Sequence, residues 1–137
     1  MTLPGLFFER EIENLVRWNV IFRFLGFASP IPDATLRCLH KCEMSTRSNS
    51  GMVLNFTFNY GGRNDIVQAA NASATAGTTE LLEEAFSQYL LTSNIRDPDL
   101  VIRTSGEHRL SNFFLWQAAK SEFWFTDILW PDLDLTM

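Results

Sequence analysis

Short strand-like segments alternate along the chain with single segments of helical periodicity. Segments 19–24, 52–58, 100–104 and 123–125 are rich in β-branched and aromatic residues, which favour strands. Apolar spacing predicts helices over 4–18, from Asp33 to a break at 48–51, from Asn64 into 72–79, between Leu82 and Tyr89, and over about 110–121. Because one helix between two strands returns the chain in the same direction, this order predicts an α/β fold with a mostly parallel sheet flanked by helices on both faces.

Local residue choice refines this pattern. Segment 52–58 is a nearly continuous apolar run, which is typical of a strand buried on both faces of a parallel sheet. Asp33 follows a segment with one glycine and two prolines, and we expect it to be the N-cap of a helix that buries Leu36, Leu39 and Cys42. The length of 137 residues, without an internal repeat, predicts one domain.

The charge balance limits the partners of the chain. Sixteen acidic and eleven basic residues give a net charge of −5 and a pI near 4.9. Such a chain has no overall positive field to hold nucleic acid or an anionic membrane, so an anionic ligand requires a local basic pocket. No apolar run approaches the roughly 18 residues of a membrane span, and residues 1–10 lack the basic start of a secretory signal. We therefore expect a cytoplasmic protein, for which a peripheral membrane contact stays open.

The cysteines and histidines do not form a recognisable reactive site. Cys38 and Cys42 lie four residues apart in a predicted helix, with His40 between them. A disulfide would be badly placed there and a metal site would lack ligands, so we expect reduced, structural thiols. His40 and His108 have no serine or cysteine partner that spacing identifies as a nucleophile, which argues against a hydrolase triad.

The densest polar cluster of the sequence follows a predicted strand. Ligands of open parallel sheets collect outside the carboxyl ends of the strands, which points to the loops 59–63, 104–111 and 126–132. In the second loop, Gly106 would permit a tight turn, and Arg109 and Ser111 would lie at the start of the next helix. With Arg103 projecting from the strand end, two guanidinium groups, a hydroxyl and free helix amides would form a cradle for a diphosphate.

A simpler interpretation of this cluster stays open. Arg103 and Arg109 would be surface arginines that pair with Glu107 or Asp99, and Ser111 would be a plain N-cap.

The loop 59–63 is a second candidate site. Its glycine pair would let the backbone approach a ligand, or it would only form a sharp turn between a strand and a helix. The candidate residues of this loop are Asn59, Gly61, Gly62 and Arg63.

One carboxylate stands out as a candidate metal ligand. Glu122 lies where a predicted helix gives way to a strand, and it would bind a hard cation or stay solvated. Other carboxylates nearby are Asp127, Asp132 and Asp134.

The longest motif resembles a known family. The run 97–113 reads Asp-Pro-Asp-Leu-Val-Ile-Arg-Thr-Ser-Gly-Glu-His-Arg-Leu-Ser-Asn-Phe, and it is followed by Trp116-Gln117, Ser121-Glu122-Phe123, Asp127 and Trp130-Pro131-Asp132. These residues closely resemble the C-terminal signature of the cis-prenyltransferases, which include the bacterial undecaprenyl diphosphate synthases. Residues 59–63 resemble the middle motif of that family, so the resemblance covers nearly the whole chain.

The resemblance implies a fold like that of undecaprenyl diphosphate synthase and a magnesium-assisted condensation of isopentenyl diphosphate onto an allylic diphosphate such as farnesyl diphosphate. It implies that Arg103, Arg109 and Ser111 bind the diphosphate of isopentenyl diphosphate. Glu122 would help to bind Mg²⁺, commonly at the subunit interface of a homodimer. The product would be a polyprenyl diphosphate lipid carrier. The cation and the arginines would neutralise diphosphate charge where the leaving group departs.

The sequence also departs from the family pattern. It contains neither the His-x-Asp-Gly-Asn-x-Arg loop, whose aspartate is central to catalysis in the family, nor the Phe-Ser-x-Glu-Asn-Trp segment, and it stops before the C-terminal Arg-x-Gly tail. We therefore expect residues 1–137 to form one partial domain, with the isopentenyl diphosphate half of the site and without the half for the allylic primer. Three hypotheses stay open: an incomplete, inactive chain of an enzyme; a non-catalytic accessory or binding subunit of a prenyltransferase; and a non-functional truncated product.

Overall fold

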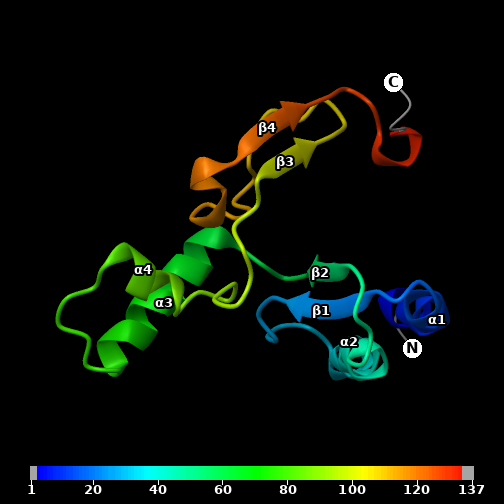
Figure 1. Ribbon diagram of the computed structural model, residues 1–137, viewed down its shortest axis with the longest axis horizontal. Coiled ribbons are helices and arrows are strands. Elements are labelled where there is room, and N and C mark those ends of the chain that lie inside the picture. The colour runs from blue at the N-terminus through cyan, green and yellow to red at the C-terminus, as the bar shows by residue number, and fades with distance from the viewer. Residues whose placement is uncertain (1–2, 134–137) are drawn as a thin grey trace. The chain divides into compact units, whose positions relative to one another are not determined.

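The chain divides into two compact units in the computed structural model, Met1–Tyr60 and Gly61–Met137, and the structure describes residues 3–133. The first unit contains α1 (Leu3–Arg17), β1 (Ile21–Leu25), α2 (Asp33–Thr46) and β2 (Val53–Thr57). The second contains α3 (Gly62–Thr75), α4 (Glu83–Ser87), β3 (Leu100–Arg103), the 3₁₀ helix η1 (Gln117–Lys120), β4 (Glu122–Phe125) and the 3₁₀ helix η2 (Trp130–Asp132) (Figure 1). None of the helices between residues 3 and 133 combines the length and hydropathy that a membrane crossing requires.

The first unit is built on a parallel strand pair. β1 and β2 pair in register from Ile21 opposite Val53 to Leu25 opposite Thr57. Helices α1 and α2 pack against each other and against β1 (Figure 1). Phe22 and Phe56 stack across the two strands, with ring centroids 5.9 Å apart. The buried core of this unit comprises Leu15, Val20, Phe22, Leu39 and Cys42.

Side chains of α2 close the outer edge of β1. The amide of Phe22 donates to Thr46 Oγ1 at 3.0 Å, and the amide of Phe24 donates to Glu43 Oε1 at 2.9 Å. Thr46 Oγ1 in turn donates to the carbonyl of Cys42 at 2.9 Å. Because these bonds satisfy amides that another strand would otherwise take, α2 ends the sheet on this side.

The second unit contains the other parallel pair and a small separate core. β3 and β4 pair in register from Leu100 opposite Glu122 to Arg103 opposite Phe125. The core comprises Ala69, Phe86 and Leu90, with Trp116 packed against it. The rings of Phe86 and Trp116 lie 4.6 Å apart, and Trp116 Nε1 donates to Ser87 Oγ at 3.1 Å.

A buried carboxylate joins three segments of the second unit. Asp65, in the first turn of α3, accepts from the amide of Leu91 at 3.0 Å and from Gln117 Nε2 at 3.2 Å. Gln117 Nε2 also donates to Thr92 Oγ1 at 2.9 Å. A buried carboxylate is tolerated only when it is well hydrogen-bonded, so these contacts hold α3, the turn near residue 91 and η1 in one arrangement.

The parallel direction of strand pairing that the sequence predicts is confirmed in both pairs. Three local expectations are corrected. Asp33 is the first residue of α2 and not its N-cap, because Pro32 takes the capping position without a side-chain bond. The strand expected over 19–24 begins at Ile21, because Asn19 has a φ of 57° and forms a turn. The helix expected between Leu82 and Tyr89 is confined to α4.

Segment 52–58 is not buried on both faces as expected. Val53 is 40% exposed and Leu54 is 39% exposed. Within residues 3–133, β2 pairs only with β1, so it is not the central strand that its apolar run predicts.

The edge closure by Thr46 generates a stability prediction. Thr46→Val keeps the shape of the side chain but leaves the buried amide of Phe22 without an acceptor, so we expect the free energy of unfolding to fall by about 1–3 kcal/mol. Urea denaturation measures this loss. Thr75→Val is the matched control, because Thr75 also ends a helix and donates to the carbonyl four residues earlier, but it is exposed. We expect the control to change stability by less than about 0.5 kcal/mol, and equal losses would contradict the role of Thr46.

Candidate functional site

The loop over residues 104–112, here called the 104–112 loop, begins at the carboxyl end of β3 and is held by the segment that follows β4. The amide of Ser105 donates to the carbonyl of Ile128 at 2.9 Å, and the amide of Gly106 donates to the carbonyl of Thr126 at 3.0 Å. The amide of Thr126 donates in return to the carbonyl of Arg103 at 3.0 Å. Two of the three loops predicted to carry a ligand therefore adjoin each other.

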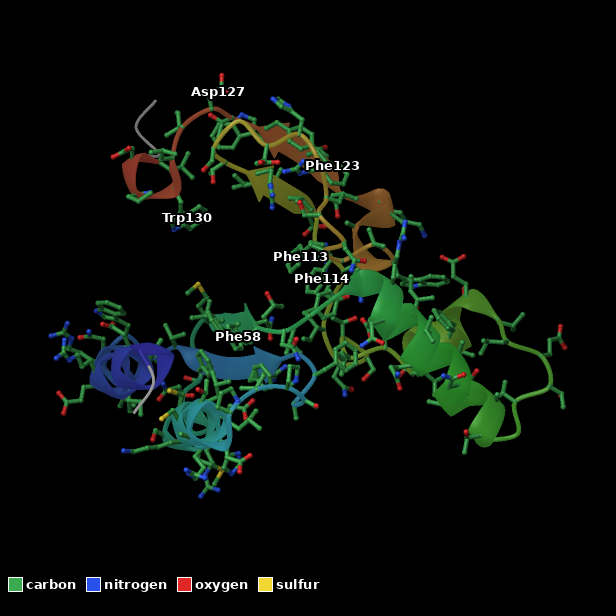
Figure 2. All side chains as sticks on the ribbon, turned by 180° about the vertical axis from the view of Figure 1, so that it is seen from behind. Phe58, Phe113, Phe114, Phe123, Asp127 and Trp130 are labelled. Atoms are coloured by element: carbon green, nitrogen blue, oxygen red, sulfur yellow. The ribbon has the colours of Figure 1, made fainter. Side chains whose placement is uncertain are left out.

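The tight turn expected at Gly106 is confirmed. Gly106 has a φ of +69°, in the left-handed region that favours glycine. A Cβ atom at this position would lie 3.1 Å from Asp127 Oδ1. Asp127 is thus the carboxylate that the structure brings against the 104–112 loop, beyond the carboxyl end of β4 (Figure 2).

Arg103 and Ser111 meet across the 104–112 loop. Arg103 Nη2 donates to Ser111 Oγ at 3.1 Å. Arg103 Nε is buried, and no acceptor for it is present within residues 3–133. A buried N–H without an acceptor costs free energy, so a movement of the Arg103 side chain that brings Nε to an acceptor would be favourable.

Arg109 is already paired. Its Nε lies 2.8 Å from Glu107 Oε2, and its Nη2 donates to Glu107 Oε1 at 3.0 Å. This contact agrees with the simpler interpretation of a surface pair, whereas Asp99 pairs with Arg96 instead, at 2.8 Å. The Arg109 side chain is 74% exposed, so the pair is solvated and an added anion would compete with Glu107 for the guanidinium.

The helix expected over about 110–121 is absent, which removes one part of the predicted cradle. Ser111, Asn112 and Phe114 have φ values of 50°, 60° and 45°, and this left-handed backbone cannot continue a right-handed helix. Helical structure begins only with η1 at Gln117. Ser111 is therefore not an N-cap, and no helix amides face a ligand at this loop.

Asn112 accepts hydrogen bonds from the first amides of α3. Its carbonyl accepts from the amide of Gly62 at 2.7 Å, and its Oδ1 accepts from the amide of Arg63 at 2.9 Å. The rings of Phe113 and Phe114 follow next to this turn (Figure 2), with centroids 4.3 Å apart. The loop 59–63 thus meets the 104–112 loop through hydrogen bonds within the second unit.

The glycine pair of the loop 59–63 allows close approach of other parts of the chain. A Cβ atom at Gly61 would lie 2.9 Å from Asn112 Nδ2, and a Cβ atom at Gly62 would lie 2.9 Å from Leu115 Cγ. The sharp turn into a helix, which was the simpler interpretation, is what the structure contains. Asn59 lies in the first unit, where its Nδ2 donates to the carbonyls of Phe27 at 2.7 Å and Ser29 at 2.8 Å.

A pocket of about 220 Å³ adjoins Arg103 and Arg109. It is smaller than the roughly 300–1,000 Å³ typical of drug-sized ligands, so it suits a small one. The pocket combines two guanidinium groups with apolar walls, which fits a molecule with an anionic head and a short apolar tail. The apolar lining consists of Val101, Ile102, Leu110, Phe113 and Phe125.

Glu122 is not among the residues that line this pocket. It is exposed at the start of β4, three residues before Phe125, which stands opposite Arg103. Three residues of strand span about 10 Å. The part of the chain that the structure describes holds no cluster of three potential metal-binding side chains. A single carboxylate still fits Mg²⁺, because that ion commonly takes one or two carboxylates together with waters and substrate phosphates.

Sequence reasoning missed the role of Asn112 and the apolar wall of the pocket. The Asn112 contact joins residues about fifty positions apart, and local spacing carries no signal for it. The sequence does offer one indication of this contact. Asparagine tolerates left-handed backbone, which is typical of a turn at Asn112, and the glycine pair at 61–62 allows another segment to approach closely. Asp134 lies outside the described residues.

Comparison with known proteins identifies relatives of the whole chain. A family model described as "Putative undecaprenyl diphosphate synthase" matches residues 1–137. An isoprenyl transferase from Bacillus subtilis (strain 168) is 48% identical over 138 residues, which cover 96% of this chain and 53% of that protein. The chain therefore spans about half the length of the curated relatives it matches.

Two solved structures are similar to this chain. Lavandulyl diphosphate synthase from Lavandula x intermedia, in complex with dimethylallyl diphosphate, has a TM-score of 0.87 and 36% identity, over 95% of this chain and 59% of that one. A probable undecaprenyl diphosphate synthase from Campylobacter jejuni has a TM-score of 0.86 and 30% identity, over 96% of this chain and 62% of that one.

The close approach at Gly62 generates a prediction. Gly62→Ala places a methyl group against Leu115 and Asn112, so we expect overpacking to lower the free energy of unfolding by about 1–3 kcal/mol in urea denaturation. Gly77→Asn is the control, because Gly77 has open space around it and asparagine accepts its φ of +75°. The control should stay within about 0.5 kcal/mol of the parent. If the Gly62→Ala chain is as stable as the control, the segment 112–115 does not pack closely against α3 at Gly62.

Proposed function

The chain belongs to the undecaprenyl diphosphate synthase family of prenyltransferases, and from this premise we propose that it carries the isopentenyl diphosphate part of a cis-prenyltransferase site. The observation that carries the proposal is the pocket beside Arg103, with its unpartnered Nε, its bond to Ser111 and its apolar walls. Isopentenyl diphosphate has the matching form, with two phosphates on a five-carbon apolar tail.

The three polar residues of the site have different tasks in this proposal. Arg103 turns so that its Nε, which is buried without an acceptor, donates to a phosphate oxygen. Ser111 is held beside it by the bond to Nη2 and offers its hydroxyl proton to the same phosphate. Arg109 releases Glu107 and turns its two paired donors to the ligand, because a diphosphate carries more charge than one carboxylate.

The proposed reaction is the condensation of isopentenyl diphosphate with an allylic diphosphate such as farnesyl diphosphate. A carbon–carbon bond forms between the two prenyl units, the allylic carbon–oxygen bond breaks, diphosphate leaves, and the isopentenyl unit loses a proton as its new double bond forms. This chain contributes by binding and orienting isopentenyl diphosphate, since positioning of reactants can supply roughly 7–11 kcal/mol of barrier lowering. The product is a longer polyprenyl diphosphate that serves as a lipid carrier.

Glu122 is the proposed protein ligand of Mg²⁺. When bound, the cation supplies Lewis-acid stabilisation of diphosphate charge. The resemblance to the family implies that this metal is shared at the interface between two subunits. We accordingly propose a homodimer located in the cytoplasm, with peripheral contact to the membrane that receives the product.

A second candidate function follows from what the sequence does not contain. The 137 residues hold no His-x-Asp-Gly-Asn-x-Arg loop for an allylic diphosphate. A non-catalytic binding subunit of a prenyltransferase would need only the pocket beside Arg103. Binding of isopentenyl diphosphate tests this candidate.

Substitution of the arginines tests the proposed site. Loss of a charge-assisted hydrogen bond costs roughly 1.5–3 kcal/mol, so Arg103→Ala should weaken binding of isopentenyl diphosphate by about 10- to 150-fold in calorimetric titration of the 137-residue chain. Arg109→Ala should weaken it less, because that side chain is exposed and must first leave Glu107.

The matched control for these variants is Arg96→Ala. Arg96 forms an exposed pair with Asp99 but does not line the pocket, so its removal should leave the affinity unchanged. Equal losses in all three variants, or none in any, would reject the site in favour of surface ion pairs.

Turnover is expected to require more than this chain. Condensation needs both diphosphates held together, so the purified 137-residue chain with Mg²⁺ should incorporate no labelled isopentenyl diphosphate into products from farnesyl diphosphate. The Bacillus subtilis isoprenyl transferase, assayed in parallel, controls for the reagents. Product formation by the 137-residue chain alone would contradict the assignment of the allylic site to residues that this sequence lacks.

A further inference from the structure

The amino-terminal half of the 104–112 loop is fixed independently of its carboxyl-terminal half. Ser105 and Gly106 are tied to the segment after β4 by two amide-to-carbonyl bonds of 2.9 Å and 3.0 Å. Ser111, which contacts Arg103, stands five residues beyond Gly106. Exposed residues lie between them, so the bonds at 105–106 do not by themselves determine where Ser111 stands.

Asn112 fixes the carboxyl-terminal half. Its carbonyl and its side-chain oxygen accept from consecutive amides, those of Gly62 and Arg63, at 2.7 Å and 2.9 Å. The first-turn amides of a helix have no partner within the helix, so they are strong donors that an outside acceptor can use. Two bonds to one residue fix both the position and the orientation of its peptide plane.

The backbone at this point explains why the residue is an asparagine. Asn112 has a φ of 60°, which asparagine tolerates better than other non-glycine residues. Glycine would accept the same φ but has no acceptor for the Arg63 amide, and aspartate would accept the φ and keep an acceptor. The two requirements, left-handed backbone and a side-chain oxygen, are separable by substitution.

We propose that Asn112 is a positioning residue that anchors the 104–112 loop on α3 and thereby holds Ser111 against Arg103. The part of this inference that concerns isopentenyl diphosphate rests on the proposed function. Ser111 is covalently next to Asn112, and its own φ of 50° leaves its hydroxyl 3.1 Å from Arg103 Nη2. Loss of the Asn112 anchor frees Ser111 and with it Nη2 of Arg103.

A double-mutant cycle on the 137-residue chain tests whether Asn112 acts through Ser111. Asn112→Gly should weaken binding of isopentenyl diphosphate about tenfold, the size of one lost hydrogen bond. In a chain that already carries Ser111→Ala, the same substitution should change the affinity by less than about twofold, because coupled residues are not additive. Additive losses, or an unchanged affinity in Asn112→Gly, would overturn the proposal. Asn94→Gly, an exposed turn residue, is the control and should leave the affinity unchanged.

Amide hydrogen exchange without ligand provides the second measurement. Asn112→Gly should accelerate exchange at Arg63 and in the 104–112 loop, whereas Asn112→Asp keeps the acceptor and should restore slow exchange at Arg63. Unchanged exchange in Asn112→Gly would overturn the anchor. If the parent chain binds no isopentenyl diphosphate, the proposed function is rejected, and the exchange rates still decide whether Asn112 anchors the loop.

Discussion

Backbone amides at strand edges and helix starts need acceptors, and this requirement organises both units of the chain. In the first unit, Thr46 and Glu43 accept from the β1 amides that point away from β2. In the second unit, Asn112 accepts from the start of α3, and Asp65 accepts from the turn at Leu91. Each acceptor belongs to a distant segment of its own unit, so satisfying local backbone groups also determines which elements pack together.

The elements that could be predicted from the sequence are those whose signal is local. Short runs of β-branched and aromatic residues indicate all four strands, and their parallel pairing is confirmed, although the helix expected between β3 and β4 is absent. The helix expected over 110–121 failed because apolar spacing does not report the left-handed φ of Ser111 and Asn112, which the contact with α3 stabilises. The position of Glu122 relative to Arg103 also could not be predicted from sequence spacing. The strand register places Glu122 opposite Leu100, three residues before the level of Arg103.

The candidate site contains two arginines in unlike states. Arg103 is held by Ser111, and its buried Nε has no acceptor, so a ligand can satisfy this donor only after the side chain moves. Arg109 is exposed and paired with Glu107, so ligand binding there exchanges one ion pair for another. At Arg103 the newly satisfied donor adds to affinity, whereas at Arg109 the net gain is small unless the ligand carries more charge than a carboxylate.

Among residues 3–133, β2 has a partner strand on one side only, whereas side chains of α2 close the other edge of β1. The segment Val53–Thr57 carries no charged residue, proline or glycine, and Val53 and Leu54 are substantially exposed. Charges and prolines are the usual protection of a sheet edge against other chains, and β2 lacks them. Concentrated solutions of the chain should therefore lose solubility through β2, and a single lysine introduced at Val53 would be the first choice for improving its handling.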